Sequence, residues 1–386
     1  MAEWKTCKLS DLGDIVGGAT PSTKDESNYG GDIPWITPKD LSNFNGRYIN
    51  RGERNITEKG LRGCSTVLLP ANSILFSSRA PIGYVAIAAN PVCTNQGFKS
   101  VVPNTETDSM FLYYLLLYNK NNIEALGSGT TFKEVSGSTM RNVEVRVPVD
   151  IETQKRIASV LSSIDEKIET NQRINDNLLQ QAQTLFADAF PYTPDDELPV
   201  GWRKGTVGDI VDIHDSKRIP LSGAQRDKMT KRTYPYYGAA SLMDYVDDYI
   251  FDGTYLLLGE DGTVVDDAGY PILQYVWGQF WVNNHAHILT GKNGFSVESL
   301  MLLFKRTPVK SIVTGAVQPK ISQANLRSIP VVIPAADVLA EFNLLIAPMF
   351  DQIRQNTDQN KALAQLRDAL LPKLMSGEID VSDVQI

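Results

Sequence analysis

Short runs of alternating apolar and polar residues mark the predicted β-strands of this chain. Two of them, residues 143–147 and 329–333, are followed by a proline, which lacks a backbone donor and closes a strand. Other apolar segments predict three more strands and two helices. The predicted strands are 66–69, 84–89 and 255–258, and the predicted helices are 109–118 and 299–304.

Residues 151–190 and 336–378 carry seam positions at alternating spacings of four and three, which is the pattern of a coiled coil. Each seam contains two consecutive asparagines. The pattern predicts two long helices that bury their seams against each other. The seam residues are Ile157, Leu161, Ile164, Ile168, Asn171, Asn175, Leu178, Ala182 and Leu185 in the first segment, and Ile346, Met349, Ile353, Asn356, Asn360, Leu363, Arg367 and Leu370 in the second.

The chain is an internal duplication. Trp4-Lys5 and the residues after it recur from Trp202-Arg203 at an offset of 198. The segment 129–148 recurs at an offset of 186, and the two seams match at an offset of 185. We therefore predict two mixed α/β domains of one fold, each followed by a long helix.

The predicted architecture is α/β (α+β), with two mixed α/β domains separated by a long antiparallel two-helix coiled coil. The order domain, helix, domain, helix allows this pairing about a pseudo-two-fold axis within one chain. A thirty-residue seam would span roughly 45 Å, or about one turn of B-DNA. The predicted segments are 1–150, 151–190, 191–335, 336–378 and a tail at 379–386.

Antiparallel pairing would place Asn171 near Asn360 and Asn175 near Asn356. An asparagine in a seam lowers stability, but it disfavours shifted registers because the amide then loses its partner. We predict that the four amides meet in one layer and set the register. The alternative is that they are surface residues of polar helices.

Several segments resemble the specificity subunits of type I restriction-modification systems. Pro148 followed by Glu152-Thr-Gln154 and Ile157 is similar to the start of that family's central helix. The second helix departs from this pattern, because its start at Ala336 lacks the Glu-x-Gln element. The other similar segments, in the family's order, are the starts at Trp4 and Trp202, Ile33-Pro-Trp-Ile-Thr37, Tyr234-Pro-Tyr-Tyr-Gly238 and Leu370-Leu-Pro-Lys-Leu-Met-Ser-Gly-Glu-Ile379.

The resemblance implies a non-catalytic subunit whose two target-recognition domains each read half of a bipartite double-stranded DNA site. It also implies recruitment of two methyltransferase subunits and of restriction/translocase (motor-nuclease) subunits. S-adenosylmethionine, ATP and Mg²⁺ would be bound by those partners, so no cofactor is expected on this chain. The alternative is the DNA-recognition subunit of a related system whose partner fuses the methyltransferase and the nuclease.

Composition modifies this picture only slightly. The net charge of −8 argues against a nucleic-acid partner, because Lys and Arg drive phosphate binding. Most of the excess negative charge lies in the helical segments and the tail, so the net charge is compatible with basic patches on the domains. The three cysteines are odd in number and widely spaced, which argues against a disulfide framework. With no signal or spanning segment, a cytoplasmic location is expected.

No catalytic motif is found, so no catalytic residue is predicted. Asn90-Pro-Val-Cys93 lacks the second proline and the aromatic residue of an adenine methyltransferase motif. His285 and His287 would face one side of a strand, but no third ligand is evident, and no metal site is predicted. An enzyme with a divergent site and a coiled-coil scaffold that never contacts DNA are the competing classes.

The candidate DNA contacts are basic, amide and aromatic side chains in loops. Asn and Gln can pair with adenine, although turn capping explains such residues about as often. Interleaved cations and tyrosines in the second domain suit phosphate and base contacts. The predicted contacts are Lys24, Lys39, Arg47, Arg51, Arg79, Asn95, Gln96, Lys99, Lys133, Lys217, Arg218, Lys228, Lys231, Arg232, Tyr236, Tyr237, Asn284, His285, Gln318 and Lys320.

Overall fold

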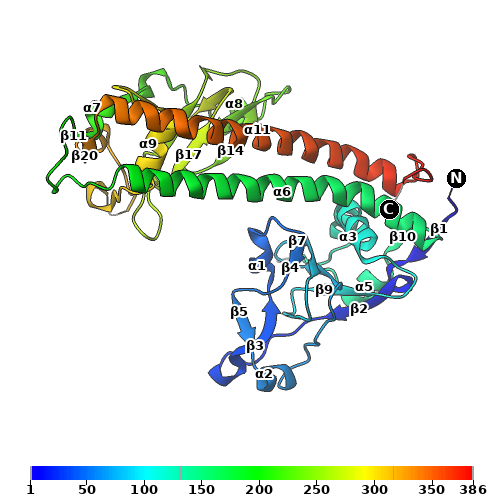
Figure 1. Cartoon of the computed structure of the whole chain (residues 1–386). Coiled ribbons are helices and arrows are strands. Elements are labelled where there is room, and N and C mark those ends of the chain that lie inside the picture. Colours follow the sequence, from blue (N-terminus) through cyan, green and yellow to red (C-terminus); the bar gives the residue numbers. More distant parts are fainter. Residues whose placement is uncertain (1, 130–132, 316, 385–386) are drawn as a thin grey trace. The chain divides into compact units, whose positions relative to one another are not determined.

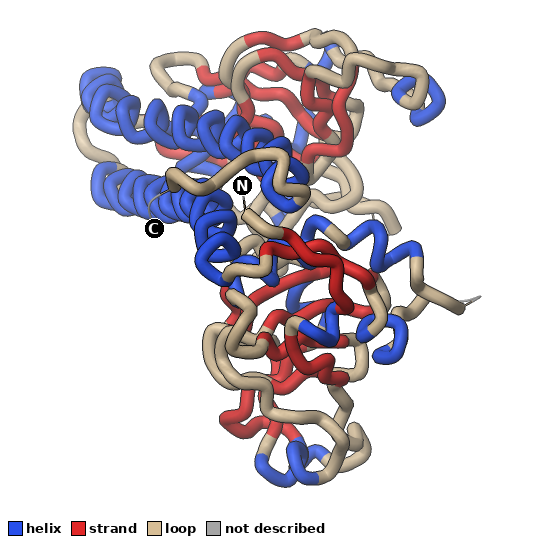
Figure 2. Tube along the Cα trace, turned by 90° about the vertical axis from the view of Figure 1, so that its right-hand side faces the viewer, coloured by secondary structure: helices blue, strands red, loops and turns tan. Residues whose placement is uncertain are grey.

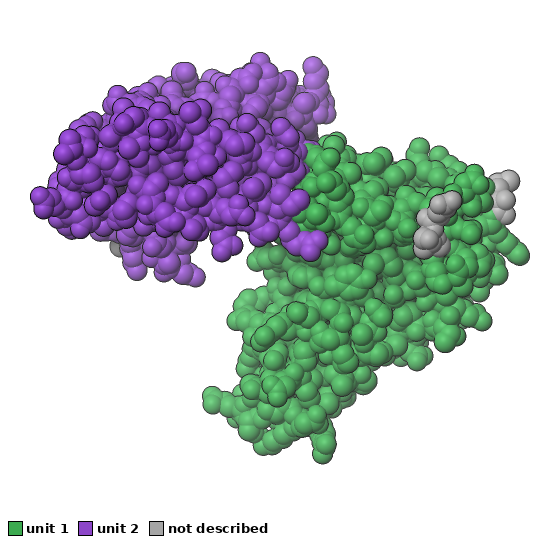
Figure 3. Space-filling view, viewed as in Figure 1, with its two compact units in different colours: residues 1–171, 359–386 green, residues 172–358 purple. Residues whose placement is uncertain are grey.

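The computed structural model describes residues 2–129, 133–315 and 317–384 and forms two compact units (Figure 3). The first unit comprises Met1–Asn171 and Gln359–Ile386, and the second comprises Gln172–Asp358. Each unit combines a globular region with parts of two long helices, α6 (Ile151–Ala189) and α11 (Ala336–Met375) (Figure 1).

The globular region of the first unit contains three sheets. A five-stranded sheet has the order β2-β9-β6-β7-β4, a three-stranded sheet the order β5-β3-β8, and β1 pairs with β10. The strands are β1 (Trp4–Lys8), β2 (Gly13–Gly17), β3 (Tyr29–Ile36), β4 (Tyr48–Ile49), β5 (Arg54–Ile56), β6 (Ile74–Ser78), β7 (Ile82–Ala88), β8 (Cys93–Thr94), β9 (Lys99–Pro103) and β10 (Glu144–Pro148).

Helix α3 (Ser109–Tyr118) forms part of the core of the first unit. Its apolar residues surround the whole helix, which is typical of a buried helix, and the Asp108 carboxylate caps it by accepting from the N–H of Phe111 at 2.8 Å. The shorter helices are η1 (Leu9–Asp11), η2 (Glu26–Asn28), α1 (Pro38–Ser42), α2 (Glu58–Arg62), α4 (Lys120–Ala125) and α5 (Gly137–Arg141).

The second unit repeats this arrangement. Its sheets have the orders β12-β19-β16-β17 and β14-β13-β18-β15, and β11 pairs with β20. The strands are β11 (Arg203–Thr206), β12 (Val211–Ile213), β13 (Tyr234–Tyr237), β14 (Leu242–Val246), β15 (Phe251–Asp252), β16 (Tyr255–Gly259), β17 (Leu273–Val276), β18 (Gln279–Val282), β19 (Ala286–Gly291) and β20 (Pro330–Ile333). The helices besides α11 are α7 (Val207–Ile210), η3 (Asp215–Lys217), α8 (Gly223–Arg226), α9 (Val297–Phe304), η4 (Lys310–Ile312) and α10 (Gln323–Arg327).

The two units therefore share a topology. The order β2-β9-β6-β7 corresponds to β12-β19-β16-β17, and the order β5-β3-β8 corresponds to β14-β13-β18. Strands and short helices make up the globular region of each unit in Figure 2. The mixed α/β class and the internal duplication predicted from the sequence are confirmed.

Two details of the sequence prediction are wrong. Residues 66–69 form no strand; only Leu69 makes an isolated bridge, to Val92. Val67 and Leu68 are exposed, so this apolar run does not mark a buried strand. The second long helix ends at Met375, before the predicted boundary at residue 378. Residues 385 and 386 of the predicted tail lie outside the described residues.

In each unit the two long helices run antiparallel, and hydrogen bonds between asparagine side chains link them. In the first unit, Asn171 Nδ2 donates to Asn360 Oδ1 at 2.8 Å. In the second unit, Asn356 Nδ2 donates to Asn175 Oδ1 at 2.9 Å. These are the two pairings that the sequence register predicts. Asn171 and Asn356 are buried, so the four residues are not surface asparagines of polar helices.

Within the described part of the chain, no helix combines the length and the apolar character that a membrane crossing requires.

Candidate nucleic-acid interface

A turn between β8 and β9 of the first unit carries Asn95 and Gln96. The Oδ1 atom of Asn95 accepts a hydrogen bond from the N–H of Gly97 at 2.8 Å, so this side chain caps the turn. Gln96 is exposed, and its amide contacts the hydroxyl of Thr20. Gln96 is therefore the amide of this turn best placed to meet a base edge.

The second unit repeats this turn between β18 and β19. The Oδ1 atom of Asn283 accepts from the N–H of His285 at 2.8 Å, as Asn95 does in the first unit. The backbone bonds that tie the two turns to the neighbouring strands are also equivalent, at 3.0 Å each. Exposed Asn284 is therefore the counterpart of Gln96. Asn284 and His285 are among the predicted DNA contacts, whereas Asn283, directly before them, caps the turn.

Two predicted cations of the first unit lie beside one carboxylate. Lys99 Nζ lies 3.3 Å from Glu134 Oε1, and Arg79 Nη1 lies 3.7 Å from Glu134 Oε2. Exposed Lys133 is the chain neighbour of Glu134. Two cations around one anion leave a local positive excess, which suits a DNA phosphate.

The second unit has a denser network at the equivalent place, where Glu260 follows β16 as Arg79 follows β6. Arg218 Nη1 lies 2.6 Å and Lys320 Nζ 3.2 Å from Glu260. Arg218 also lies 3.5 Å from Asp215, and only 13% of its side chain is exposed. Arg218 is thus held by two carboxylates, whereas Lys320 is half-exposed and can reach outward.

His287 is buried and joins this network. Its Nδ1 lies 2.6 Å from Asp215 Oδ2, and its Nε2 lies 2.8 Å from the carbonyl oxygen of Ile321. The buried ring is thus held on both sides, by a carboxylate and by a backbone carbonyl. Burial opposes ionisation of Asp215, but hydrogen bonds from His287 and Ile288 outweigh it and hold the pKa of this carboxyl below its usual value.

The ligand atoms of Asp215, Glu260 and His287 lie within 4.8 Å of one another, a grouping that sequence spacing could not reveal. Arg218 and Lys320 already neutralise the two carboxylates, so the cluster has the chemistry of a salt-bridge network. The premise that His285 and His287 lie on one strand is wrong. His285 lies outside β19 and contacts Asp261 instead.

A basic loop, defined as residues 217–233, provides several exposed cations of the second unit. Lys217, Lys228 and Lys231 are exposed and make no ion pair among the described residues. Arg226 and Arg232 instead contact Asp244, at 2.9 and 3.5 Å. The three lysines are therefore the cations of this loop that are free for phosphate contacts.

The other predicted contacts of the surface are scattered. Lys39 pairs with Glu53 at 2.7 Å, and both side chains are largely exposed. Lys24, Arg51 and Gln318 are exposed. Within the described residues, no hydrogen bond or ion pair ties these side chains to the two turns.

The structure corrects the prediction for Arg47. This guanidinium is buried, and its Nε and Nη2 atoms donate to the two carboxylate oxygens of Glu169 on α6, at 2.9 and 3.2 Å. Burial disfavours the charged guanidinium, but the bonds to Glu169 outweigh it and raise the pKa of Arg47. Arg47 therefore docks its domain on the helix and is not available to DNA.

Replacing Arg47 with Met should lower the stability of the chain by about 2 kcal/mol, because Glu169 loses a charged, bidentate donor. For a unit of this size that corresponds to a fall of about 4–8 °C in Tm, measured by calorimetry. Lys39→Met is the matched control, since its pair with Glu53 is exposed and should contribute little. Equal Tm values for the two variants would contradict the docking role.

Tyr236 and Tyr237 also differ from the prediction. Tyr236 is buried, and its hydroxyl accepts from the N–H of Leu221 at 3.0 Å, so it belongs to the core. Tyr237 is half-buried, and burial raises its pKa. Alternation along β13 turns these two side chains to opposite faces, which a count of aromatic residues could not show.

Sequence analysis missed an apolar surface beside the second turn. Leu242, Met243 and Tyr245 on β14 are 41%, 53% and 43% exposed. The Nδ2 atom of Asn283 lies 3.3 Å from Met243 Sδ, which places Met243 at the turn. Apolar side chains can contact the thymine methyl group in the major groove, so this surface is a candidate for base contact.

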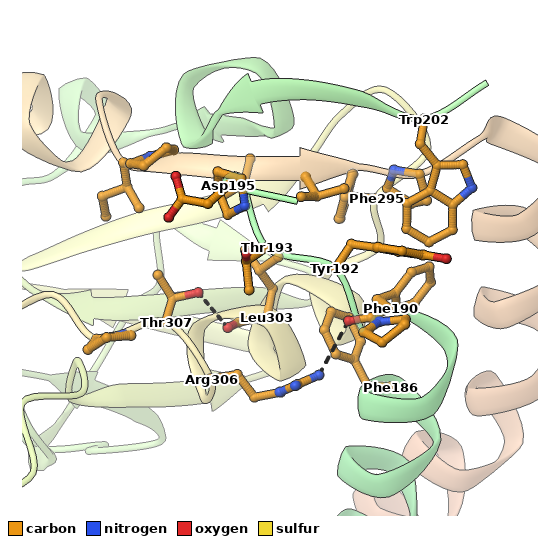
Figure 4. Close-up of a pocket in the computed structure, with 18 of the residues that line it drawn as sticks. Phe186, Phe190, Tyr192, Thr193, Asp195, Trp202, Phe295, Leu303, Arg306 and Thr307 are labelled. Carbon is orange, nitrogen blue, oxygen red and sulfur yellow. Dashed lines mark hydrogen bonds between the residues drawn. The ribbon is translucent and has the colours of Figure 1, made fainter. Parts of the chain in front are cut away.

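The second unit also contains an apolar pocket of about 480 Å³. Phe186, Phe190, Tyr192 and Trp202 form its aromatic side (Figure 4). The segment between α6 and β11 lines it, and Arg306 Nη1 donates to the carbonyl of Phe190 at 3.5 Å. None of the predicted DNA contacts lines this pocket, so it is separate from the candidate interface.

Comparisons with known proteins match the whole of this architecture. The family model described as type I restriction modification DNA specificity domain matches twice, at residues 1–180 and 199–365. The specificity subunit of the type I restriction enzyme MjaIX of Methanocaldococcus jannaschii is 34% identical, over 99% of this chain and 95% of the relative. The EcoprrI specificity subunit of Escherichia coli is 23% identical, over 95% and 91%.

A solved structure has the same fold. The crystal structure of the type I restriction-modification S subunit from M. genitalium aligns with a TM-score of 0.59 and 18% identity. The alignment covers 97% of this chain and 96% of the other.

Proposed function

Because this chain belongs to the type I restriction-modification DNA specificity family, we propose that each of its two globular regions reads one half of a bipartite DNA target. We propose further that its long helices recruit methyltransferase and motor-nuclease subunits. The chain is a specificity subunit that recognises a DNA target and is not itself an enzyme.

The repeated turn is the observation that carries the bipartite proposal. Each unit presents one exposed amide, Gln96 or Asn284, on a turn fixed by a capping asparagine. Cations accompany both turns, namely Lys99 and Lys133 in the first unit and Lys320 in the second. An amide that meets a base edge between cations that anchor phosphates is the minimum needed for direct readout.

Exposed apolar residues on the long helices support partner recruitment. Leu344 and Leu345 of α11 are 76% and 54% exposed in the second unit. Leu366 of α11 is 48% exposed in the first unit, and Ile174 of α6 is 38% exposed in the second. Apolar side chains left on an otherwise polar helix favour a protein partner that covers them.

DNA contact by the basic loop is tested by a salt titration. Replacing Lys217, Lys228 and Lys231 together with Ala should weaken binding to every sequence. It should also reduce the slope of log affinity against log salt by up to about 3, since each phosphate contact contributes about 0.9. The measurement is fluorescence anisotropy of labelled duplex DNA with the chain in its methyltransferase complex.

The matched control removes three cations that already have acidic partners. Lys59, Arg62 and Lys155 pair with Asp25, Glu58 and Glu152, so their replacement by Ala should leave the salt slope nearly unchanged. The same slope for the basic-loop variant and the unaltered complex would exclude the loop from the interface.

A further inference from the structure

The contacts between the asparagines of the helix pair do not by themselves distinguish α6 from α11. Asn171 and Asn175 of α6 stand at the same seam positions as Asn356 and Asn360 of α11, at the offset of 185. Their side-chain bonds fix how far one helix slides along the other. The same contacts between asparagines could form if α6 paired with α6 of a second copy of the chain. The bond from Asn171 Nδ2 to Gln359 Oε1, at 2.7 Å, would be lost there, because Gln359 corresponds to Ile174 of α6. Register is thus encoded, but the contacts between asparagines do not encode which helices pair.

An ion pair in the first unit breaks this equivalence. Arg367 Nη1 of α11 lies 2.8 Å from Asp165 Oδ1 of α6, and only 8% of the Asp165 side chain is exposed. The hydroxyl of Tyr114 on α3 donates to Asp165 Oδ2 at 2.5 Å. A carboxylate buried to this degree is stable only while both donors are present.

The equivalent place in the second unit is apolar. At the same offset, Asp165 corresponds to Phe350 and Arg367 corresponds to Ala182. Phe350 is 1% exposed, Ala182 is 0% exposed, and both belong to one apolar cluster. Equivalent positions of the helix pair therefore hold an ion pair with a buried carboxylate in the first unit and a buried apolar pair in the second.

The ion pair between domain and helix also has opposite polarity in the two units: the helix supplies the anion in the first and the cation in the second. Glu169 of α6 accepts from Arg47 in the first unit. Its counterpart on α11 is Arg354, which donates to Glu298 at 3.0 Å in the second unit. Each domain thus carries the charge that fits its own helix and would meet a like charge on the other.

We propose that Asp165 and Arg367 form an identity key that makes α6 pair with α11 and excludes pairing with a second copy of the same helix. In an α6–α6 pair with the asparagines in contact, Asp165 would face Ala182 and would be buried without a cation. In an α11–α11 pair, Arg367 would face Phe350. Each symmetric pair of helices contains two charged residues that face apolar ones, so the free-energy penalty against pairing with a second copy is counted twice. This proposal concerns pairing alone and does not depend on the DNA target.

The key is tested in the full chain by charge reversal. Asp165→Arg places two cations together, and Arg367→Asp places two carboxylates together, so each single variant should shift the unfolding equilibrium at least about tenfold toward the unfolded chain. The double variant D165R/R367D restores an ion pair and should recover most of this loss. Single variants as stable as the unaltered chain, or a double variant no better than either, would overturn the proposal.

A mixing experiment tests whether the charges at positions 165 and 367 decide which helices pair. Full-length D165R and R367D chains of different mass are unfolded together, refolded and examined by native mass spectrometry. Exchange of helices between the two variants restores the opposite charges at both seams, so the dimers should be almost all mixed. Two differently labelled unaltered chains should give no excess of mixed dimers. A mixed share no greater than the statistical one, or equal amounts of dimer in the mixture and in each variant alone, would show that pairing ignores this charge.

Discussion

Exchanging residues 1–150 for the equivalent domain of a relative should change one half of the methylated DNA motif and leave the other half and the gap intact. Each unit has its own sheets, its own apolar core and its own capped turn, so the bases read by one should not depend on the other. The measurement is methylome sequencing of cells that express the chimaera with its methylating partner. The expected effect is complete replacement of one half-site.

The reciprocal chimaera, with residues 191–335 exchanged, is the control and should alter the other half-site alone. The structure adds a condition to both designs. The first domain must retain a cation that pairs with Glu169, and the second a carboxylate that pairs with Arg354, because these contacts dock each domain on its helix. Simultaneous change of both halves in chimaeras that meet this condition would refute independent reading.

The fold was predictable because its signals are long and repeated. The duplication extends over most of the chain and each seam over most of a long helix, so a local error does not remove them. Short elements were less predictable. Helices such as α2 and α5 last one turn and depend on a cap, Thr57 or Ser136, whose side chain resembles that of any polar loop residue.

The candidate site was predictable only as a set of loops. Arg47 appeared in a basic segment like its neighbours, and its partner Glu169 lies 122 residues further along the chain. Likewise, Asn95 and Gln96 are adjacent amides, yet the first caps a turn and the second is exposed. Burial and partner choice depend on tertiary contacts, which residue type and local spacing do not specify.

Replacing Asn171, Asn175, Asn356 and Asn360 together with Leu should raise the Tm of the chain and loosen the spacing between half-sites. Asn171 and Asn356 are buried, and the Oδ1 atom of Asn171 has no hydrogen-bond partner among the described residues. Leucine removes the free-energy cost of a buried amide oxygen without a hydrogen-bond partner, and it buries additional apolar surface. We expect a gain of about 2 kcal/mol or more, which corresponds to a rise of about 4–8 °C.

The same substitution removes the penalty for slipped registers. The amides now meet each other, Asn171 with Asn360 and Asn175 with Asn356, and a shift of one heptad would separate these pairs and leave most of the amides facing apolar side chains. That shift moves one helix by roughly 10 Å, or about three base pairs of DNA, so methylome sequencing should find motifs with more than one gap. Asn177→Leu, at an exposed position of α6, is the control and should change neither Tm nor gap. A single unchanged gap together with an unchanged Tm in the fourfold variant would exclude the asparagines as the determinant of register, whereas a higher Tm with an unchanged gap would transfer that role to Asp165 and Arg367.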